Sequence, residues 1–411
     1  MRRALLFAAA LFAVSASRVA VGSDPQDFAQ IERGRYLTIV GDCAACHTAT
    51  SGADFAGGRA IETPFGTIVS TNITPDRETG IGDWSNDQFV SALTEGIRRD
   101  GAHLYPAMPY PYLTKITRDD ALAIRAYLTT VPAVSNAVTA DRLPFPLSIR
   151  ADMAAWNKLY FTPGAFQPNS GKSDEWNRGS YLVEGLMHCG ACHTPKNTAG
   201  ADKDSERLQG GVIQGWFAPN ITNDQRRGLG RWSLDDIVTY LKTGHNAFSA
   251  ATGPMAEEIA ESSSKMTEAD LHAVAIYLKD QPSADNHSPV PLPAGDPAMQ
   301  TGAAIYADEC SGCHTPRGSG IAGLFPRLAG SPSVQSDDPT SLIRIVINGT
   351  RSVSTPAAPT GPGMPAFGWL LNDGEVASVL TYIRNNWGNA ATSIAAERVT
   401  SQRKALVRTS E

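Results

Sequence analysis

All six cysteines of the 411-residue chain fall into three pairs of the same pattern. Two residues separate the cysteines of each pair, and a histidine directly follows the second cysteine. The three segments are Cys43-Ala44-Ala45-Cys46-His47, Cys189-Gly190-Ala191-Cys192-His193 and Cys310-Ser311-Gly312-Cys313-His314. The same cysteine spacing occurs in redox disulfides and in halves of zinc sites. The histidine after every pair favours a different chemistry.

This pattern is the attachment signal for a c-type haem. The two thiols lie on one helical turn and form thioethers with the vinyl groups of the porphyrin, and the adjacent histidine faces the iron. We therefore predict three covalently bound c-type haems, with His47, His193 and His314 as proximal ligands. Each haem also supplies a flat apolar surface around which a small domain can form.

The second axial ligand of each iron has to come from further along the chain. Histidine and methionine are the residues that fill this position in electron-transfer haems. After His314 the sequence contains no further histidine and a single methionine, Met364. Met108 and Met255 follow the histidines of the first two motifs at separations that agree to within one residue. This spacing favours methionine at all three sites.

Two histidines compete with these methionines. His103 and His245 precede Met108 and Met255, and each is close enough in sequence to reach an iron. His103 stands seven residues after Gly96, whereas His245 directly follows Gly244. If both histidines were iron ligands, the two repeats would need different geometries. Methionine is therefore the preferred ligand. A histidine and methionine pair leaves no open coordination position, which predicts haems that carry electrons rather than bind substrate.

The motifs stand in three copies of a longer pattern, which we call the first, second and third repeats. Each motif follows a helical segment containing Gly34, Gly179 or Gly302. Amphipathic stretches then predict middle helices at 89–97, 237–241 and 342–347, each ending near a glycine. The capping pairs that predict the start of a last helix are Thr117 with Asp120, Thr267 with Asp270, and Asn372 with Glu375. The first two repeats also share Asn-Ile-Thr and Gly-x-Gly-x-Trp-Ser sequences, which the third lacks.

These patterns predict an all-α fold of three tandem cytochrome c domains joined by irregular linkers. The predicted boundaries are a signal peptide at 1–22, domains at 23–135, 174–283 and 297–388, linkers at 136–173 and 284–296, and a C-terminal tail at 389–411. The first linker contains Trp156, Tyr160 and Phe161, so part of it is expected to pack on the domains. The tail carries Arg398, Arg403, Lys404 and Arg408. We expect it to be a solvated, frayed end, with a membrane-surface or partner contact as the alternative.

The N-terminus indicates export. Arg2 and Arg3 precede an apolar run at 4–16 and then small residues, which is the pattern of a cleaved signal peptide. We expect the mature protein in the periplasm, with association through partners at the outer face of the cytoplasmic membrane as a further expectation. The chain has 35 basic against 41 acidic residues, a balance that gives no support for nucleic-acid binding.

The sequence resembles the triple-haem cytochrome c subunits of bacterial periplasmic dehydrogenases for alcohol, gluconate, aldehyde or nicotinate. The stretches that carry the resemblance are 63–68 (Thr-Pro-Phe-Gly-Thr-Ile), 70–76 (Ser-Thr-Asn-Ile-Thr-Pro-Asp), 104–110 (Leu-Tyr-Pro-Ala-Met-Pro-Tyr) and 183–185 (Val-Glu-Gly). The resemblance implies ligation by His47 with Met108, His193 with Met255 and His314 with Met364. It also implies a separate catalytic subunit containing a quinone, flavin or molybdenum cofactor, and delivery of electrons to ubiquinone or an oxidase.

Three functions are compatible with such a chain. The first is an electron-transfer subunit that is not catalytic on organic substrates alone. The second is a haem enzyme of the peroxidase type, which would need an iron with a displaceable sixth ligand, whereas every repeat here offers a methionine. The third is a free multihaem electron shuttle. The sequence favours the first of these functions.

Overall fold

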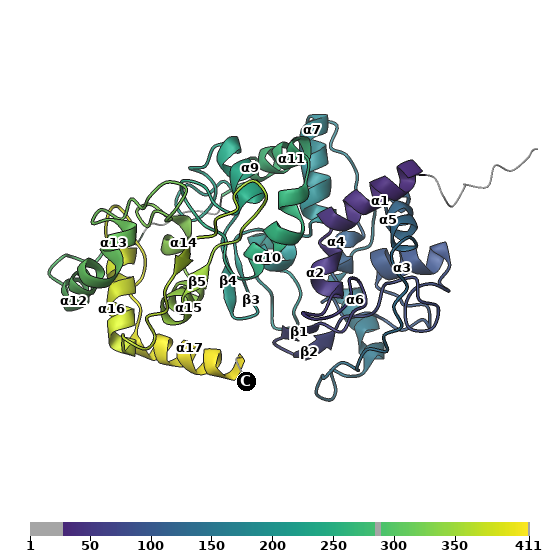
Figure 1. The fold of residues 1–411 in the computed structure, drawn as a ribbon, viewed down its shortest axis with the longest axis horizontal. Helices are drawn as coiled ribbons and strands as arrows, with labels where there is room; N and C mark the ends of the chain where they lie inside the picture. Colours follow the sequence, from purple (N-terminus) through teal and green to yellow (C-terminus); the bar gives the residue numbers. More distant parts are fainter. Residues whose placement is uncertain (1–27, 284–288, 410–411) are drawn as a thin grey trace, which may run out of the picture.

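The computed structural model describes residues 28–283 and 289–409, and helices dominate it (Figure 1). The chain runs from one side of the molecule, drawn in purple, through a teal and green middle to a yellow C-terminal part on the other side. The predicted signal peptide at 1–22 lies outside the described residues, as does part of the predicted linker at 284–296. No helix in the described parts of the chain has the length and apolar character needed to cross a membrane.

The first and last helices of each repeat pack against each other across a glycine. The pairs are α1 (Phe28–Val40) with α5 (Arg118–Leu128), α7 (Asp174–Tyr181) with α11 (Glu268–Lys279), and α12 (Pro297–Ile305) with α16 (Asp373–Arg384). A Cβ atom on Gly34 would lie 1.8 Å from the Ala123 carbonyl oxygen, and one on Gly179 would lie 1.9 Å from that of Ala273. Gly302 meets the carbonyl of its partner helix in the same way, at 2.2 Å. The repeated glycine is required because the two helix backbones touch.

The predicted starts of the last helices and the glycines that end the middle helices are confirmed, whereas the middle helices begin two to three residues earlier than predicted. Thr117, Thr267 and Asn372 cap α5, α11 and α16, and each side chain accepts a hydrogen bond from the backbone N–H three residues on. The middle helices are α3 (Asn86–Glu95), α9 (Leu234–Thr243) and α15 (Thr340–Asn348), and they end at Gly96, Gly244 and Gly349. All three glycines have positive φ, which suits a residue without a side chain.

The remaining α-helices are short, lie between the repeats or, in the case of α17, follow the third repeat. They are α2 (Cys43–His47), α4 (Tyr110–Leu113), α6 (Met153–Tyr160), α8 (Gly190–His193), α10 (Pro254–Glu261), α13 (Ser311–His314), α14 (Pro332–Gln335) and α17 (Ala396–Thr409). In the second and third repeats, π-helical stretches at Leu182–Leu186 and Tyr306–Cys310 connect the first helix to the cysteine motif.

Three antiparallel hairpins are additions to the all-α expectation. They are β1 (Ala60–Thr63) with β2 (Gly66–Val69), β3 (Gly211–Ile213) with β4 (Trp216–Ala218), and β5 (Thr350–Arg351) with β6 (Gly363–Met364). The first two follow the cysteine motif of their repeat, whereas the third lies beyond α15. Strands of two to four residues are too short to show a periodic pattern, so the sequence did not reveal them. Helices with a few small sheets still fit a cytochrome c fold.

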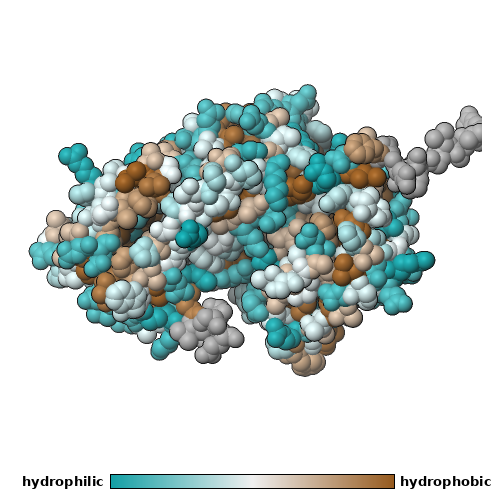
Figure 2. Space-filling model, in the orientation of Figure 1, coloured by the Kyte–Doolittle hydropathy of each residue, from teal (hydrophilic) through white to brown (hydrophobic). Residues whose placement is uncertain are grey.

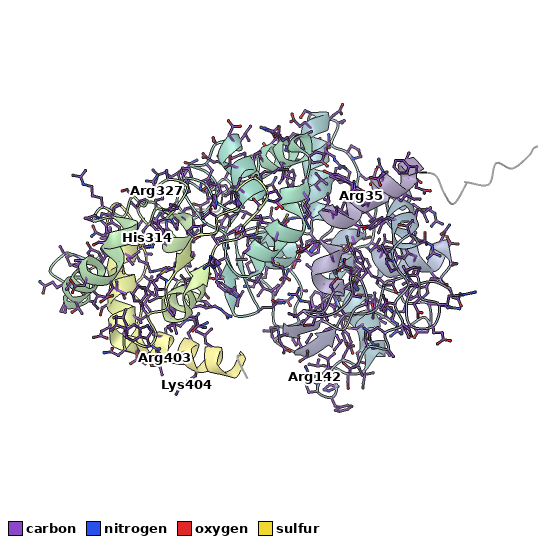
Figure 3. All side chains as sticks on the ribbon, in the orientation of Figure 1. Arg35, Arg142, His314, Arg327, Arg403 and Lys404 are labelled. Carbon is purple, nitrogen blue, oxygen red and sulfur yellow. The ribbon has the colours of Figure 1, made fainter. Side chains whose placement is uncertain are left out.

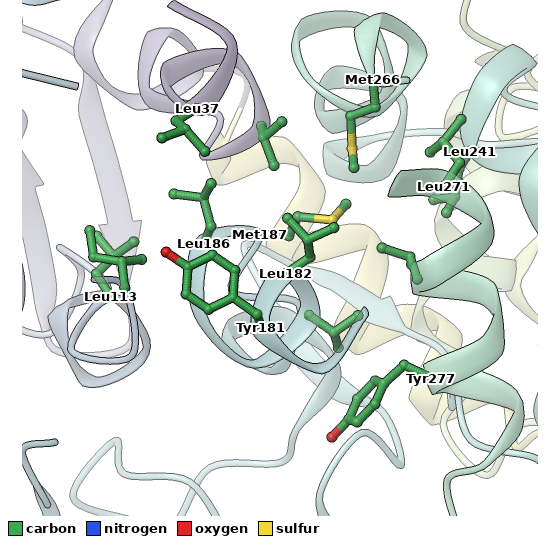
Figure 4. Close-up of a cluster of buried hydrophobic side chains, with 14 of the residues drawn as sticks. Leu37, Leu113, Tyr181, Leu182, Leu186, Met187, Leu241, Met266, Leu271 and Tyr277 are labelled. Atoms are coloured by element: carbon green, nitrogen blue, oxygen red, sulfur yellow. The ribbon is translucent and has the colours of Figure 1, made fainter. Parts of the chain in front are cut away.

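The buried hydrophobic side chains of the described residues form two clusters. The first combines the first and second repeats: Leu37 and Leu113 lie with Tyr181, Leu182 and Leu186 (Figure 4). The second is confined to the third repeat and its C-terminal helix. The first two repeats therefore share one core, and the third repeat has its own.

Two tyrosine hydroxyls join the first two repeats in a reciprocal way. The Tyr181 hydroxyl donates to Asp120 Oδ2 at 2.5 Å, and the Tyr36 hydroxyl donates to Asp270 Oδ2 at 2.6 Å. Each aspartate also binds the arginine that stands three residues before the tyrosine of its own repeat. We call these six residues, two tyrosines, two aspartates and two arginines, the tyrosine clasp. Tyr181 of the second repeat thus binds the first turn of α5 in the first repeat, and Tyr36 of the first repeat binds the first turn of α11 in the second.

The predicted linker at 136–173 contains ordered structure, in agreement with its aromatic residues. The Trp156 indole N–H of α6 donates to the Ala199 carbonyl at 2.9 Å. The next residue, Asn157, accepts a hydrogen bond from the Tyr110 hydroxyl at 2.5 Å. This segment therefore packs on both the first and the second repeats.

The expectation of a frayed C-terminal tail is wrong. Helix α17 packs on α15 and α16, and its Val399 and Leu406 side chains are buried. Arg403 donates to Asp373 Oδ1 and to the Gly368 carbonyl, both at 2.8 Å (Figure 3). Two buried side chains in a mostly polar helix are a weak sequence signal, which is why the docking was missed.

On the face drawn in Figure 2, hydrophobic residues lie in separate groups rather than in one band.

Candidate haem sites

The three cysteine motifs adopt the same local helical form. Helix α2 begins at Cys43, directly after a left-handed residue at Asp42, and ends at His47. Helices α8 and α13 carry the second cysteine and the histidine of the other two motifs. Side chains three residues apart on a helical turn project to the same side, and all six cysteines are free of disulfides. Both thiols of each pair are therefore available to one prosthetic group.

Each motif histidine has its Nδ1 atom close to a backbone carbonyl oxygen. The distances are 2.7 Å from His47 to Thr71, 2.6 Å from His193 to Pro219 and 2.9 Å from His314 to Pro326. Because a carbonyl only accepts, Nδ1 carries the proton and Nε2 keeps a free lone pair. Burial lowers the pKa of all three imidazoles, which favours the neutral ring. Each ring is thus held ready to bind a metal through Nε2.

The carbonyl acceptors explain the Asn-Ile-Thr sequences of the first two repeats. Thr71 and Pro219 directly precede Asn72 and Asn220. Each asparagine side chain accepts a hydrogen bond from the backbone N–H of the threonine two residues on, at 2.9 and 2.8 Å. This Asx turn fixes the loop that presents the carbonyl. The sequence showed the repeated triplets, but not their role, because the acceptors are backbone atoms.

The three predicted methionine ligands pack against the same cores as the cysteines. Met108 and Met255 contact the shared cluster, as do the first cysteines of the two motifs. Met364 and Cys310 contact the core of the third repeat. The local structures differ: Met108 lies in a turn before α4, Met255 lies in the first turn of α10, and Met364 ends β6. The structure therefore brings each methionine and its motif to one core, without a common backbone form.

The two competing histidines differ from each other. His103 Nδ1 lies 3.4 Å from the Asn157 amide nitrogen, so His103 is directed toward the segment between the repeats. His245 has a buried Nε2 atom with no hydrogen-bond partner among the described residues. His245 is therefore the competitor that Met255 has to be tested against.

A buried donor near the second repeat's core also fits a haem. Trp232, from the second Gly-x-Gly-x-Trp-Ser sequence, is 6% exposed and stacks on Phe248 with ring centroids 5.5 Å apart. Its indole N–H has no partner in the described parts of the chain. A buried N–H normally finds an acceptor, and a haem propionate would supply one. Paired thiols, histidines with a free Nε2 and this unpartnered donor are together consistent with covalently bound haem.

Known proteins resemble the chain over nearly its whole length. The sequence model of the cytochrome c family matches residues 299–387. The gluconate 2-dehydrogenase cytochrome c subunit of Pantoea cypripedii is 42% identical, over 94% of this chain and 92% of that protein. The cytochrome c subunit of alcohol dehydrogenase (quinone) from Gluconacetobacter polyoxogenes is 40% identical, over 95% and 87%. The fructose dehydrogenase cytochrome subunit of Gluconobacter japonicus is 39% identical, over 90% and 82%.

Proposed function

Because the chain belongs to the family of cytochrome c subunits of dehydrogenases, we propose that it carries electrons from a partner dehydrogenase through three covalently bound haems. The observation that carries this proposal is the histidine that donates through Nδ1 to a backbone carbonyl, repeated after all three cysteine pairs. Haem c supplies a one-electron iron couple when it is bound. One such site would serve any c-type cytochrome, whereas three in one chain suit a relay.

The residues of the three sites follow from the motifs. We assign the thioether bonds to Cys43 and Cys46, Cys189 and Cys192, and Cys310 and Cys313. We assign the axial ligands to His47 with Met108, His193 with Met255, and His314 with Met364. A neutral imidazole and a thioether sulfur together favour the reduced iron and raise its potential. These six axial ligands would hold the three irons on both sides, which would leave no position there for a substrate.

The partner and the acceptor are inferred from the relatives and from the sequence. The relatives are named as subunits of gluconate, alcohol and fructose dehydrogenases, so the electron donor of this chain is a catalytic dehydrogenase subunit. That subunit is a quinoprotein, a flavoprotein or a molybdenum enzyme, and the acceptor is ubiquinone or a terminal oxidase. The N-terminal segment with the pattern of a signal peptide supports a periplasmic location at the outer face of the cytoplasmic membrane.

The test is to express the chain with the dehydrogenase subunits encoded beside it. The complete complex should reduce a ubiquinone analogue when it is given the substrate of the catalytic subunit. Without this chain, quinone reduction should stop, while small artificial dyes should still collect electrons from the catalytic subunit. Quinone reduction that continues without the chain would contradict the relay.

A matched variant tests the number of haems in the relay. Intact mass of the mature chain should show three haem additions, and replacing Cys310 and Cys313 with serine should remove one of them. The chain alone should oxidise no alcohol or aldehyde and should not decompose peroxide at an enzymatic rate. Turnover by the isolated chain would favour a haem enzyme instead.

A further inference from the structure

Arg59 connects the first cysteine motif to the methionine segment of the second repeat. Its guanidinium donates to the carbonyl of Ala45, which lies between Cys43 and Cys46, and to both carboxylate oxygens of Glu257, with the Nη2 to Oε2 bond at 2.8 Å. Glu257 lies on α10, two residues after Met255. One side chain of the first repeat therefore contacts the attachment helix of one haem site and the ligand helix of the next.

A second contact fixes α10 in place. The Ser262 hydroxyl, directly after α10, donates to the Val40 carbonyl at 3.1 Å. Val40 is the last residue of α1, just before the first cysteine motif. The second repeat's methionine helix is thus attached to the first repeat on both sides of the motif.

An equivalent set of contacts joins the segment after Met108 in the first repeat to the cysteine motif of the second repeat. Tyr112, on α4 and four residues after Met108, donates to Asp202, which in turn binds Lys196. Lys196 Nζ donates to the Gly190 carbonyl at 3.2 Å, inside the second cysteine motif. Arg59 thus joins the first motif, through Glu257, to the segment that contains Met255 of the second repeat. Lys196 joins the second motif, through Asp202, to the segment that contains Met108 of the first repeat. The symmetry indicates a built arrangement rather than an accidental surface ion pair.

From these contacts we propose that Arg59 is a positioning residue shared by the first two haem sites, which holds α10 against α2 and places its positive charge between the two sites. The proposal rests on the proposed function, since it takes Met255 as the second site's ligand. Arg59 is 29% exposed and Glu257 is 40% exposed, so solvent screens the pair only in part. A charge in this position acts on the redox equilibrium of both sites.

The sign of the effect follows from Coulomb's law. Reduction adds one negative charge to a haem, so a nearby cation stabilises the reduced form and raises the potential. Arg59→Gln is therefore expected to lower the potentials of the first and second sites together. Glu257→Gln removes a negative charge and is expected to raise the same two potentials. The third site should not respond to either substitution.

The experiment is a redox titration of the full-length protein with all haems attached. In the reduced protein, the methyl group of each coordinated methionine gives a separate NMR signal shifted by the porphyrin ring current, so each site can be followed by itself. Variants at Met108, Met255 and Met364 assign the signals. The three potentials are then compared among the unaltered chain, Arg59→Gln, Arg59→Lys and Glu257→Gln.

A charge effect predicts that Arg59→Gln and Glu257→Gln shift the two potentials in opposite directions. A general loosening of the contact between α2 and α10 would shift the potentials in the same direction in both variants. Arg59→Lys keeps the charge and should restore most of the shift. The control is Arg77→Gln, which breaks an ion pair with Asp83 on the surface of the same repeat, where Arg77 is 81% exposed. This variant should leave all three potentials unchanged.

The outcomes distinguish this inference from the proposed function. If Arg59→Gln and Glu257→Gln shift only one site, or neither, Arg59 is not shared and the inference fails while the relay stands. If the unaltered chain has fewer than three redox-active haems, the proposed function itself fails. If Arg59→Gln does not fold, the Glu257→Gln and Arg59→Lys titrations still decide the question.

Discussion

The first two repeats and the third repeat solve the same packing problem in different ways. The first two share one hydrophobic cluster and the tyrosine clasp, whereas the third has a separate core completed by α17. At the positions equivalent to the clasp arginine, tyrosine and aspartate, the third repeat has Thr301, Ala304 and Glu375. Three similar sequences therefore give one paired unit and one independent unit, and the third repeat lacks the side chains that form the clasp.

The contact between the second and third repeats is of another kind. The Phe217 backbone N–H donates to the Ser341 hydroxyl at 2.8 Å, and Arg226 donates to the Ala390 carbonyl at 2.8 Å. Arg344 lies over the Trp216 ring at 4.6 Å. These contacts are largely polar and join surfaces that are already complete. We therefore expect that a substitution that destabilises one of the first two repeats also destabilises the other. A substitution in the core of the third repeat should destabilise only the third repeat.

The largest expected effect is the loss of an axial ligand. Met364→Ala should open the third iron completely, so that the reduced protein binds carbon monoxide there and the potential of that site falls, with both thioethers intact. Met255→Ala should open the second iron, and Met255→Ala with His245→Ala should look the same. An unchanged low-spin spectrum in Met255→Ala, lost only in the double variant, would make His245 the ligand.

The next effect tests how far unfolding spreads. Gly34→Ala places a methyl group against the Ala123 carbonyl and should destabilise the protein by about 3 kcal/mol or more. Because the first two repeats share a core, both should unfold together, whereas the third should keep its stability. Gly302→Ala should lower the stability of the third repeat alone. Urea unfolding followed by haem circular dichroism, with hydrogen exchange to locate the change, would measure both, and unfolding of the first repeat by itself in Gly34→Ala would contradict the shared core.

The clasp can be weakened without disturbing the helix packing. Tyr181→Phe removes the hydrogen bond to the buried Asp120 carboxylate and the one that the hydroxyl accepts from the Thr117 backbone N–H, which together should cost about 2 kcal/mol in the unfolding of the first two repeats. The control is Tyr105→Phe, which loses a more exposed bond to the Leu147 carbonyl and should change the stability by about 0.5 kcal/mol or less. Equal effects in the two variants would mean that the clasp does not hold the repeats together.

The last effect is a pH dependence of the paired unit. Burial raises the pKa of Glu258 on α10 to about 7 from 4.5. The folded state therefore holds this proton more tightly than the unfolded state, and the contribution of Glu258 to the unfolding free energy should fall by about 3 kcal/mol as pH rises from about 4.5 to about 7, then level off. Glu258→Gln should remove this contribution and leave that of Asp42, whose pKa burial raises to about 9, whereas Glu261→Gln, at an exposed ion pair, should keep both. Denaturant titrations of the first two repeats over this pH range would measure it.

Much of each repeat could be predicted from local sequence. The capping residues Thr117 and Thr267, the terminal Gly96 and Gly244, and the cysteine motifs act over a few residues, so their patterns are visible in the chain itself. The arrangement between repeats could not be predicted in this way. Tyr36 and Asp270 are far apart in sequence, and a tyrosine in a helix gives no sign of which distant carboxylate it meets.

The residues of the candidate haem sites also fall into those that local sequence predicts and those that it does not. The histidines and cysteines follow from the motif, but the Thr71, Pro219 and Pro326 acceptors are carbonyls that any residue could supply. The docking of α17 was hidden because Val399 and Leu406 are isolated among polar residues. The sequence therefore predicts the candidate haem ligands, while the structure shows the backbone carbonyls that orient the three histidines.

The tyrosine clasp also bears on how such a chain can be divided or assembled. A fragment containing the first repeat alone would expose Leu37 and Leu113 to water and leave Asp120 without its tyrosine, so it should be a poor independent module. A fragment ending at residue 283 would keep the whole shared cluster, and one starting at Asp296 would keep the core of the third repeat together with α17. A division or fusion at this boundary is therefore expected to leave both cores intact, whereas one between the first and second repeats would open the shared core.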